Sequence, residues 1–247
     1  MTDILLMSLV GLIGGFVGSQ AGAGSLITLP ALLFLGLPPA LAVGTNILSA
    51  WLTNVVAALT YWRKGKLRNQ ETFSLGIIAF FGSLGGAYLI LYIPEDLTRK
   101  IIGILFLLLI GVLVWENGKK GEKEKKKPKH ALGVAHIISF VLGVYGGFLS
   151  VAVTTLFILM FVLLLRRSFV EGVAEAVTVS AILLFGALVV FVKEGSINMA
   201  LALPLAIGSV IGAYGGAKTA MKLGEKWIKP LVGIVMIGAA TKLLLNF

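Results

Sequence analysis

The second half of this chain repeats the first. Several glycines coincide after a shift of 130 positions: Gly65 with Gly195, Gly82 with Gly212, and Gly86 with Gly216. Both halves are almost entirely apolar. Two related apolar halves are the plan of many secondary transporters, whose substrate site lies where the halves meet. The repeat therefore predicts two similar units with a site between them.

The composition requires a lipid environment. Hydrophobic residues make up 58% of the 247 residues and charged ones only 13%, which is more apolar surface than a soluble domain of this length can bury. The uncharged runs also suit helices of about 20 residues, which cross a bilayer. We therefore expect an all-α, polytopic helical membrane protein whose surroundings are the lipid bilayer.

Charge and cysteine content exclude several functions. The net charge is +10, but the lysines and arginines lie between the apolar runs, where they set topology and do not form a nucleic-acid surface. We expect no nucleic-acid partner. The chain has no cysteine, which excludes disulfides, thiolate catalysis and cysteine metal sites. We expect no cofactor, no metal site and no catalytic residue.

Two glycine-rich segments predict interrupted helices. Residues 4–36 carry no charge, and one helix of that length would be about 50 Å long, beyond a hydrocarbon core of about 30 Å. Glycines crowd its middle, at 18–25, and residues 131–165 repeat the pattern around Gly143 and Gly147. Because glycine at this density weakens a helix, we expect each segment to form two half-length helices joined by an unwound loop, as a broken hairpin.

Three spans are expected after each broken hairpin. In the first repeat (1–117) they are 40–62, 72–93 and 97–116, and in the second repeat (131–247) they are 168–192, 197–220 and 226–246. A lysine-rich linker, 118–130, separates the repeats and is expected in the cytoplasm.

The basic residues predict how the repeats are oriented in the cytoplasmic (inner) membrane. Arg166 and Arg167 belong on the cytoplasmic side with the linker. This holds only if 131–165 begins and ends on one side, as a re-entrant hairpin. Each repeat then crosses the membrane an odd number of times, so the second is inverted and both termini lie outside. A parallel repeat is the alternative, but it violates the charge rule in the second half.

The two broken hairpins form the predicted site. Unwound backbone at membrane depth occurs only where it lines a cavity or is buried in protein, and helices that begin there direct N–H dipoles at an anion. We expect a small anionic substrate to be bound by Gln20, Gly22, Ala23, Gly24, Ser25, Thr28, Asn46, Ser49, Ser150, Thr154 and Thr155. The same residues also suit tight helix packing and interhelical hydrogen bonds, and we expect packing alone for Gly82, Gly86 and their equivalents.

Two carboxylates lie in the span that follows the second hairpin. We expect Glu171, one turn past the basic pair, to be able to pair with Arg166 and Arg167. Glu175 lies deeper, and an intramembrane carboxylate is a functional hypothesis by default. It either takes up and releases a proton during transport, tunes the field at the anion site, or makes a structural hydrogen bond.

The order of motifs resembles a known family. The glycine-rich stretch 15–25, Leu29-Pro30, Gly36-Leu37-Pro38-Pro39, the stretch 42–46 and Tyr61-Trp62 are similar to motifs of the TauE/SafE sulfite exporter family. The resemblance implies two related halves and export of sulfite, sulfonates or related organosulfur anions. The second repeat departs from the pattern, with Arg166-Arg167 in place of a Gly-Leu-Pro turn, so the two half-sites are expected to differ chemically.

We therefore expect a secondary transporter that exports a small sulfur-containing anion, sulfite or an organosulfonate, across the cytoplasmic membrane by alternating access. An anion channel is the main alternative. A non-transporting membrane subunit would not need polar broken helices, and an intramembrane enzyme would need a nucleophile–base pair or metal ligands that the sequence does not offer. The sequence leaves a homo-oligomer open.

Overall fold

The fold over the residues that the structure describes is helical. The computed structural model describes residues 2–67, 70–98, 100–102 and 130–223. Its helices are α1 (Thr2–Ala21), α2 (Ser25–Phe34), α3 (Pro39–Arg63), α4 (Glu71–Tyr92), α6 (Ala131–Phe148), α7 (Val153–Leu159), the π-helical turn η1 (Met160–Leu164), α8 (Phe169–Lys193) and α9 (Met199–Leu223). Six of them are long and apolar enough to cross a membrane. The expected all-α membrane fold is confirmed.

Four of the expected spans have counterparts among these helices. They are α3 for 40–62, α4 for 72–93, α8 for 168–192 and α9 for 197–220. The expected spans 97–116 and 226–246 lie wholly or almost wholly outside the described residues, as do the linker 118–130, apart from His130, and the C-terminus.

Both glycine-rich segments are broken, but their first arms are longer than expected. α1 has 20 residues and α6 has 18, so each is long enough to span, whereas the return arms are short: α2 has 10 residues and α7 has 7. The half-length prediction was wrong because the glycines inside α1 serve packing. A Cβ on Gly11 or Gly15 would collide with backbone carbonyls of α9, so these positions bring the two helices together without interrupting either.

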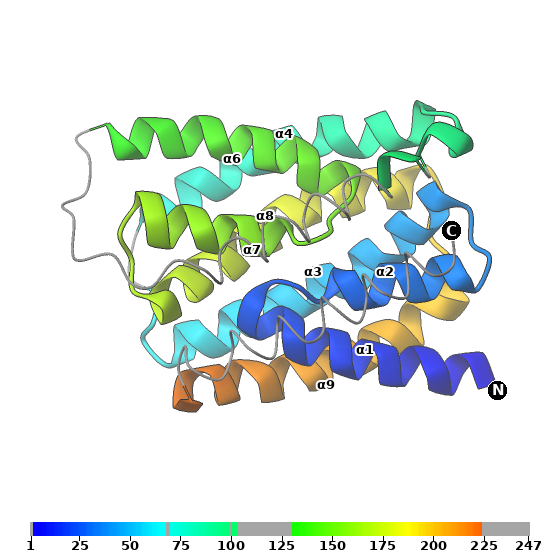
Figure 1. Ribbon diagram of the computed structural model, residues 1–247, viewed down its shortest axis with the longest axis horizontal. Helices are drawn as coiled ribbons and strands as arrows, with labels where there is room; N and C mark the ends of the chain where they lie inside the picture. The colour runs from blue at the N-terminus through cyan, green and yellow to red at the C-terminus, as the bar shows by residue number, and fades with distance from the viewer. Residues whose placement is uncertain (1, 68–69, 99, 103–129, 224–247) are drawn as a thin grey trace.

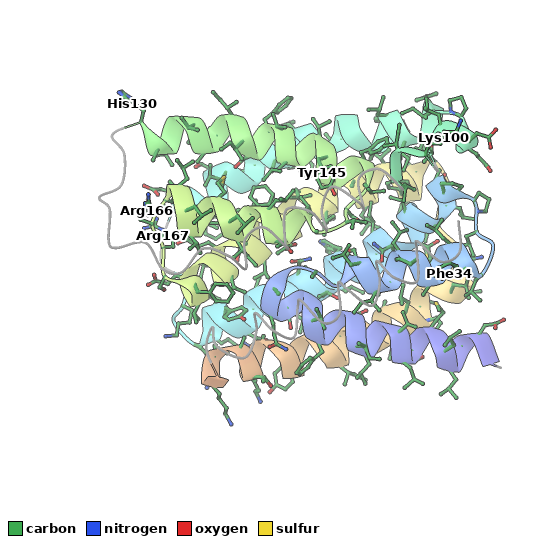
Figure 2. The ribbon with its side chains drawn as sticks, in the orientation of Figure 1. Phe34, Lys100, His130, Tyr145, Arg166 and Arg167 are labelled. Atoms are coloured by element: carbon green, nitrogen blue, oxygen red, sulfur yellow. The ribbon has the colours of Figure 1, made fainter. Side chains whose placement is uncertain are left out.

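Each broken pair begins and ends at one end of the bundle, and the two pairs use opposite ends. In Figure 1, α1 starts at the end marked N, and α2 returns to that end. Figure 2 places Phe34, the last residue of α2, there, and places His130, Arg166 and Arg167, which flank the second pair, at the other end. The two breaks thus meet inside the bundle from opposite directions.

The long helices pack in a symmetric order. Contacts join α1 to α9, α9 to α3, α3 to α8, α8 to α4, and α4 to α6. α3 and α8 therefore lie at the centre, with α1 and α9 on one side and α4 and α6 on the other (Figure 1). Each outer pair takes one helix from each repeat.

Glycines hold the outer pairs together. A Cβ on Gly82 or Gly86 of α4 would collide with the backbone of α6, and one on Gly212 or Gly216 of α9 with the backbone of α1. Without a side chain at these positions the helix backbones approach closely, which is how helices associate in lipid. The packing role expected for these glycines is confirmed.

Candidate functional site

A small cavity lies where the two breaks meet α3. Its volume is about 20 Å³, room for about one water molecule. Its lining residues come from α1, the first break, α2, α3, the second break, α7, α8 and α9: Gly14, Gly18, Gly22, Gly24, Ser25, Thr28, Ser49, Ala50, Thr53, Asn54, Ser150, Thr154, Leu184 and Ser209. All of them are uncharged, and more than half of them are glycines or hydroxyl side chains.

Asn46 of α3 ties the two breaks together beside this cavity. Its Oδ1 accepts a hydrogen bond from the Thr28 hydroxyl of α2. Its Nδ2 donates to Oγ of Ser150, 3.1 Å away, in the second break. All three side chains are buried, so a loss of one bond leaves a polar group without water. Because Ser150 accepts here, its own hydroxyl proton is free to donate.

A second set of hydrogen bonds joins the repeats at residues that line the cavity. The Thr154 hydroxyl lies 3.3 Å from Oδ1 of Asn54 and 2.8 Å from Oγ of Ser180. The hydroxyls of Ser49 and Ser209 are 2.6 Å apart, and only one of them can donate to the other. α3 is therefore bonded to the second break, and separately to α9.

The cavity presents hydrogen-bond donors and positive dipole ends. The hydroxyls of Ser25 and Thr53 line it and have no hydrogen-bond partner among the described residues. α2 and α7 begin at the two breaks, and neither start has a side-chain cap. At α2 the N–H groups of Leu26, Ile27 and Thr28 donate to the carbonyls of Ala23 and Gly24, so this start contributes its dipole rather than free donors. A helix N-terminus carries partial positive charge. The oxygen of Asn46 is meanwhile occupied by the Thr28 hydroxyl, which favours a ligand that accepts hydrogen bonds.

The backbone of the two breaks differs. Gly22 has φ +73°, and a Cβ there would collide with the backbone of Thr154 and Thr155. In the second break Ser150 and Ala152 have φ +58° and +53°. Side chains rarely adopt this left-handed region, so the second break is strained where the first uses glycine.

Carbonyl groups at both breaks are bonded by side chains from elsewhere. The Tyr145 hydroxyl of α6, labelled in Figure 2, donates to Val151 O at 2.7 Å. Tyr61 of α3 donates to Ser19 O at 3.2 Å. The Thr155 hydroxyl of α7 donates to Ala21 O at 2.7 Å, which joins the second pair to the end of α1.

Seven of the eleven residues expected to bind substrate line the cavity: Gly22, Gly24, Ser25, Thr28, Ser49, Ser150 and Thr154. Four do not. Asn46 and Thr155 hold the breaks as described, Gln20 donates to Phe16 O of its own helix, and Ala23 is buried.

Sequence reasoning left out the other lining residues. The sequence shows Thr53 on the polar face of Asn46 and Ser49, with Asn54 beside it, but leaves that face open between substrate contact and interhelical hydrogen bonds. Gly14 and Gly18 continue the glycine pattern of α1. Ala50, Leu184 and Ser209 gave no signal, since their place depends on how α3, α8 and α9 pack.

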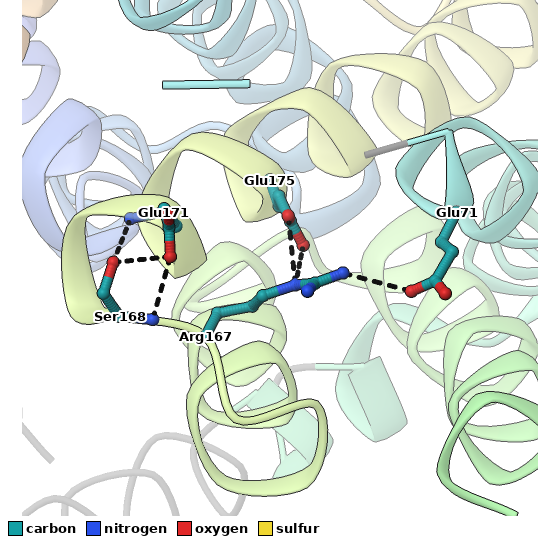
Figure 3. Close-up of polar contacts among 5 residues, drawn as sticks. All are labelled: Glu71, Arg167, Ser168, Glu171 and Glu175. Carbon is teal, nitrogen blue, oxygen red and sulfur yellow. Dashed lines mark hydrogen bonds and ion pairs between the residues drawn. The ribbon is translucent and has the colours of Figure 1, made fainter. Parts of the chain in front are cut away.

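Of the two carboxylates of α8, Glu175 and not Glu171 pairs with the basic turn (Figure 3). Glu171 accepts from the backbone N–H and the hydroxyl of Ser168 and closes a capping box at the start of α8. Glu175, whose side chain is only 1% exposed, pairs instead with Arg167 at 3.2 Å. The capping geometry holds Glu171 back toward Ser168, so its expected pairing with the basic turn was wrong. Glu175 does not line the cavity.

The whole chain matches one family. A family model described as sulfite exporter TauE/SafE matches residues 7–243. The chain belongs to the TauE/SafE family. It is similar to the probable membrane transporter protein YfcA of Escherichia coli K12, with 32% identity over 95% of this chain and 87% of the relative.

Other relatives are named in the same way. A probable membrane transporter protein of Haemophilus influenzae is 31% identical over 98% of this chain and 94% of its own length. YdhB of Bacillus subtilis, also named a probable membrane transporter protein, is 30% identical over 88% and 89%. No solved structure matches significantly. This member of the TauE/SafE family is thus a multi-pass membrane transporter.

Proposed function

We propose that this transporter is a secondary carrier that exports a small sulfur-containing anion, sulfite or an organosulfonate, across the cytoplasmic membrane. It works by alternating access between two inverted repeats, and the anion binds at the cavity between the two breaks. The observation that carries the proposal is that cavity, which combines unpartnered hydroxyls with two uncapped helix starts.

The chemistry of the lining suits an anion that must also leave. Neutral hydroxyls and helix dipoles hold a negative charge by hydrogen bonds and partial charges. A lysine or arginine in a low-dielectric cavity would attract the anion far more strongly, because Coulomb energies rise as the dielectric constant falls. The lining residues carry no formal charge, so release does not require separation of an ion pair.

The cavity volume favours a carrier over a channel. A space of about 20 Å³ holds about one water molecule, and a sulfur oxyanion is larger. Binding therefore requires the walls to move apart, and the opposite openings of the two helix pairs supply two directions for that movement (Figure 1). Rocking of repeats around a central site is how many such transporters work.

Flux into proteoliposomes tests the substrate. We expect sulfite or an organosulfonate to be transported, with sulfate and acetate as comparison anions. Ser25→Ala and Thr53→Val each remove one donor from the cavity and should raise KM about two- to tenfold, the value of one neutral hydrogen bond. Ser8→Ala and Thr219→Val are matched controls, because both hydroxyls bond to carbonyls of their own helices.

Three results would count against the proposal. Absence of flux for every sulfur anion would rule out the proposed substrate class. Equal KM changes in cavity and control variants would rule out the cavity as the binding site. Unitary currents in planar bilayers would favour an anion channel over a carrier.

A further inference from the structure

The loop after the second helix pair carries an ion cluster that the proposed anion site does not use. Nε of Arg167 lies 3.2 Å from Oε1 of Glu175, and its Nη2 lies 3.1 Å from Oε2 of Glu71 (Figure 3). Glu175 belongs to α8, which follows the loop, whereas Glu71 begins α4 of the first repeat. One guanidinium thus fastens the end of the α7–η1 arm to two different helices.

The two ion pairs differ in how easily they break. The side chain of Glu175 is 1% exposed, and separating a buried carboxylate from its cation leaves an uncompensated charge. The side chain of Glu71 is 35% exposed, so water can solvate it when the contact opens. The Arg167–Glu71 contact is therefore the one that yields. Glu175 neutralises the guanidinium whether the Arg167–Glu71 contact is made or broken.

Among the residues that the structure describes, the corresponding corner at the other end of the bundle carries no such cluster. The shift of 130 positions places Leu37 at Arg167, Thr45 at Glu175 and Leu201 at Glu71. The turn itself is the same, because Gly36 and Arg166 both have positive φ, +82° and +57°. Leu37 is buried, and the Thr45 hydroxyl accepts a hydrogen bond from Asn198 N at 3.0 Å. One corner is closed by ion pairs and the other by apolar and neutral contacts.

The ion cluster is connected to the cavity by one short helical arm. Ser150 and Thr154 line the cavity at the start of α7, and the arm runs through η1 directly to Arg166 and Arg167. A displacement of the loop therefore moves two of the cavity walls. A π-helical turn such as η1 is a frequent feature of functional sites.

We propose that the Arg167–Glu71 contact is a latch that holds the α7–η1 arm closed, and that its rupture opens the cavity toward the end of the bundle where Arg167 lies. This inference rests on the proposed function, because it assigns the gate of the same cavity. The matching corner at Leu37 has no ion pair to break among the described residues. Ionic strength therefore acts on one gate only.

The absence of cysteine allows a direct test by thiol labelling. Ser49→Cys places a reporter in the cavity, and a separate His130→Cys chain marks the latch end, where Figure 2 shows His130 beside the second pair. A membrane-impermeant thiol reagent is applied to one face of sealed vesicles. Adding Glu71→Gln should speed labelling of the reporter from the latch end about two- to fivefold, the effect of losing one partly exposed ion pair.

Glu171→Gln is the matched control. It removes a carboxylate at the same end, and glutamine still supports a capping box, so it should leave the labelling rate unchanged. Salt gives a second measurement that needs no change at Glu71. Raising ionic strength from about 0.01 M to about 1 M shortens the screening length about tenfold and should speed labelling of the Ser49→Cys chain. In the Glu71→Gln chain that salt effect should disappear.

The outcomes separate the latch from the substrate. Labelling requires no anion, so it tests the latch independently of the substrate. If Glu71→Gln speeds labelling but the protein transports no sulfur anion, the latch is supported and the proposed substrate is wrong. Equal rates with and without Glu71→Gln, together with no salt effect, would overturn the latch. So would a reporter that reacts from neither face, or one that Glu171→Gln accelerates equally.

Discussion

The two helix breaks make the same turn with different residues, and the difference shows what each contributes. The first break has glycine at φ +73°, and its backbone packs directly against the second. The second break holds Ser150 and Ala152 at positive φ, where a side chain costs about 1–2 kcal/mol per residue. Ser150 gains a hydrogen bond from Asn46 in exchange. In the first repeat the close approach of the two backbones requires glycine. In the second repeat a hydrogen bond compensates for a serine in a strained conformation.

Gly22→Ala should have the largest effect on this comparison. The new Cβ would collide with the backbone of Thr154 and Thr155, and φ +73° disfavours any side chain. Steric overlap and strain together should lower the free energy of unfolding by about 3 kcal/mol or more. Thermal unfolding of the purified protein in detergent measures it.

Gly36→Ala is the control for Gly22→Ala. Its φ is +82°, but nothing lies within 4 Å of the new Cβ, so only the strain of about 1–2 kcal/mol remains. If both variants unfold at the same temperature, the contact between the two breaks is not what requires glycine.

Ala152→Gly should have the next largest effect, and should stabilise the protein. Glycine relieves the left-handed strain at φ +53°, although it adds entropy to the unfolded chain, so the net gain is at most about 1 kcal/mol. Ser150→Gly relieves similar strain but removes the acceptor of the Asn46 Nδ2 bond, and should not stabilise. A rise in Tm for Ser150→Gly that matches Ala152→Gly would show that the serine contact contributes nothing.

The tyrosine contacts give the smallest effect. Tyr145→Phe leaves Val151 O without its donor, and Tyr61→Phe does the same for Ser19 O. Side-chain hydrogen bonds between membrane helices average about 0.6 kcal/mol, so each variant should lower Tm slightly. The shorter Tyr145 bond should be worth more. A larger loss for Tyr61→Phe would show that bond length does not rank these two contacts.

The sequence determined the architecture more fully than the site. Long uncharged runs and doubled glycines predicted the helices and the broken pairs, because these depend on local composition. The break falls inside the predicted stretch 18–25, but composition did not predict that α1 would span 20 residues. Packing against α9 keeps α1 helical through Gly11 and Gly15, which propensity alone disfavours. Helical spacing placed Thr53 on the polar face of Asn46 and Ser49 but did not assign that face to the site. Ser209 was not predicted, because it meets Ser49 only through the packing of α9 on α3.

The pairing of α1 with α9 has a consequence for biosynthesis. α1 is made early, but the helix that fills its glycine face begins at residue 199. Ribosomal synthesis must therefore deliver most of the polypeptide before the first helix finds its permanent neighbour. A nascent chain halted between α8 and α9 would contain both helices of the α4–α6 pair, but its α1–α2 hairpin would lack its packing partner α9. Quality-control proteases should recognise such an intermediate by that hairpin.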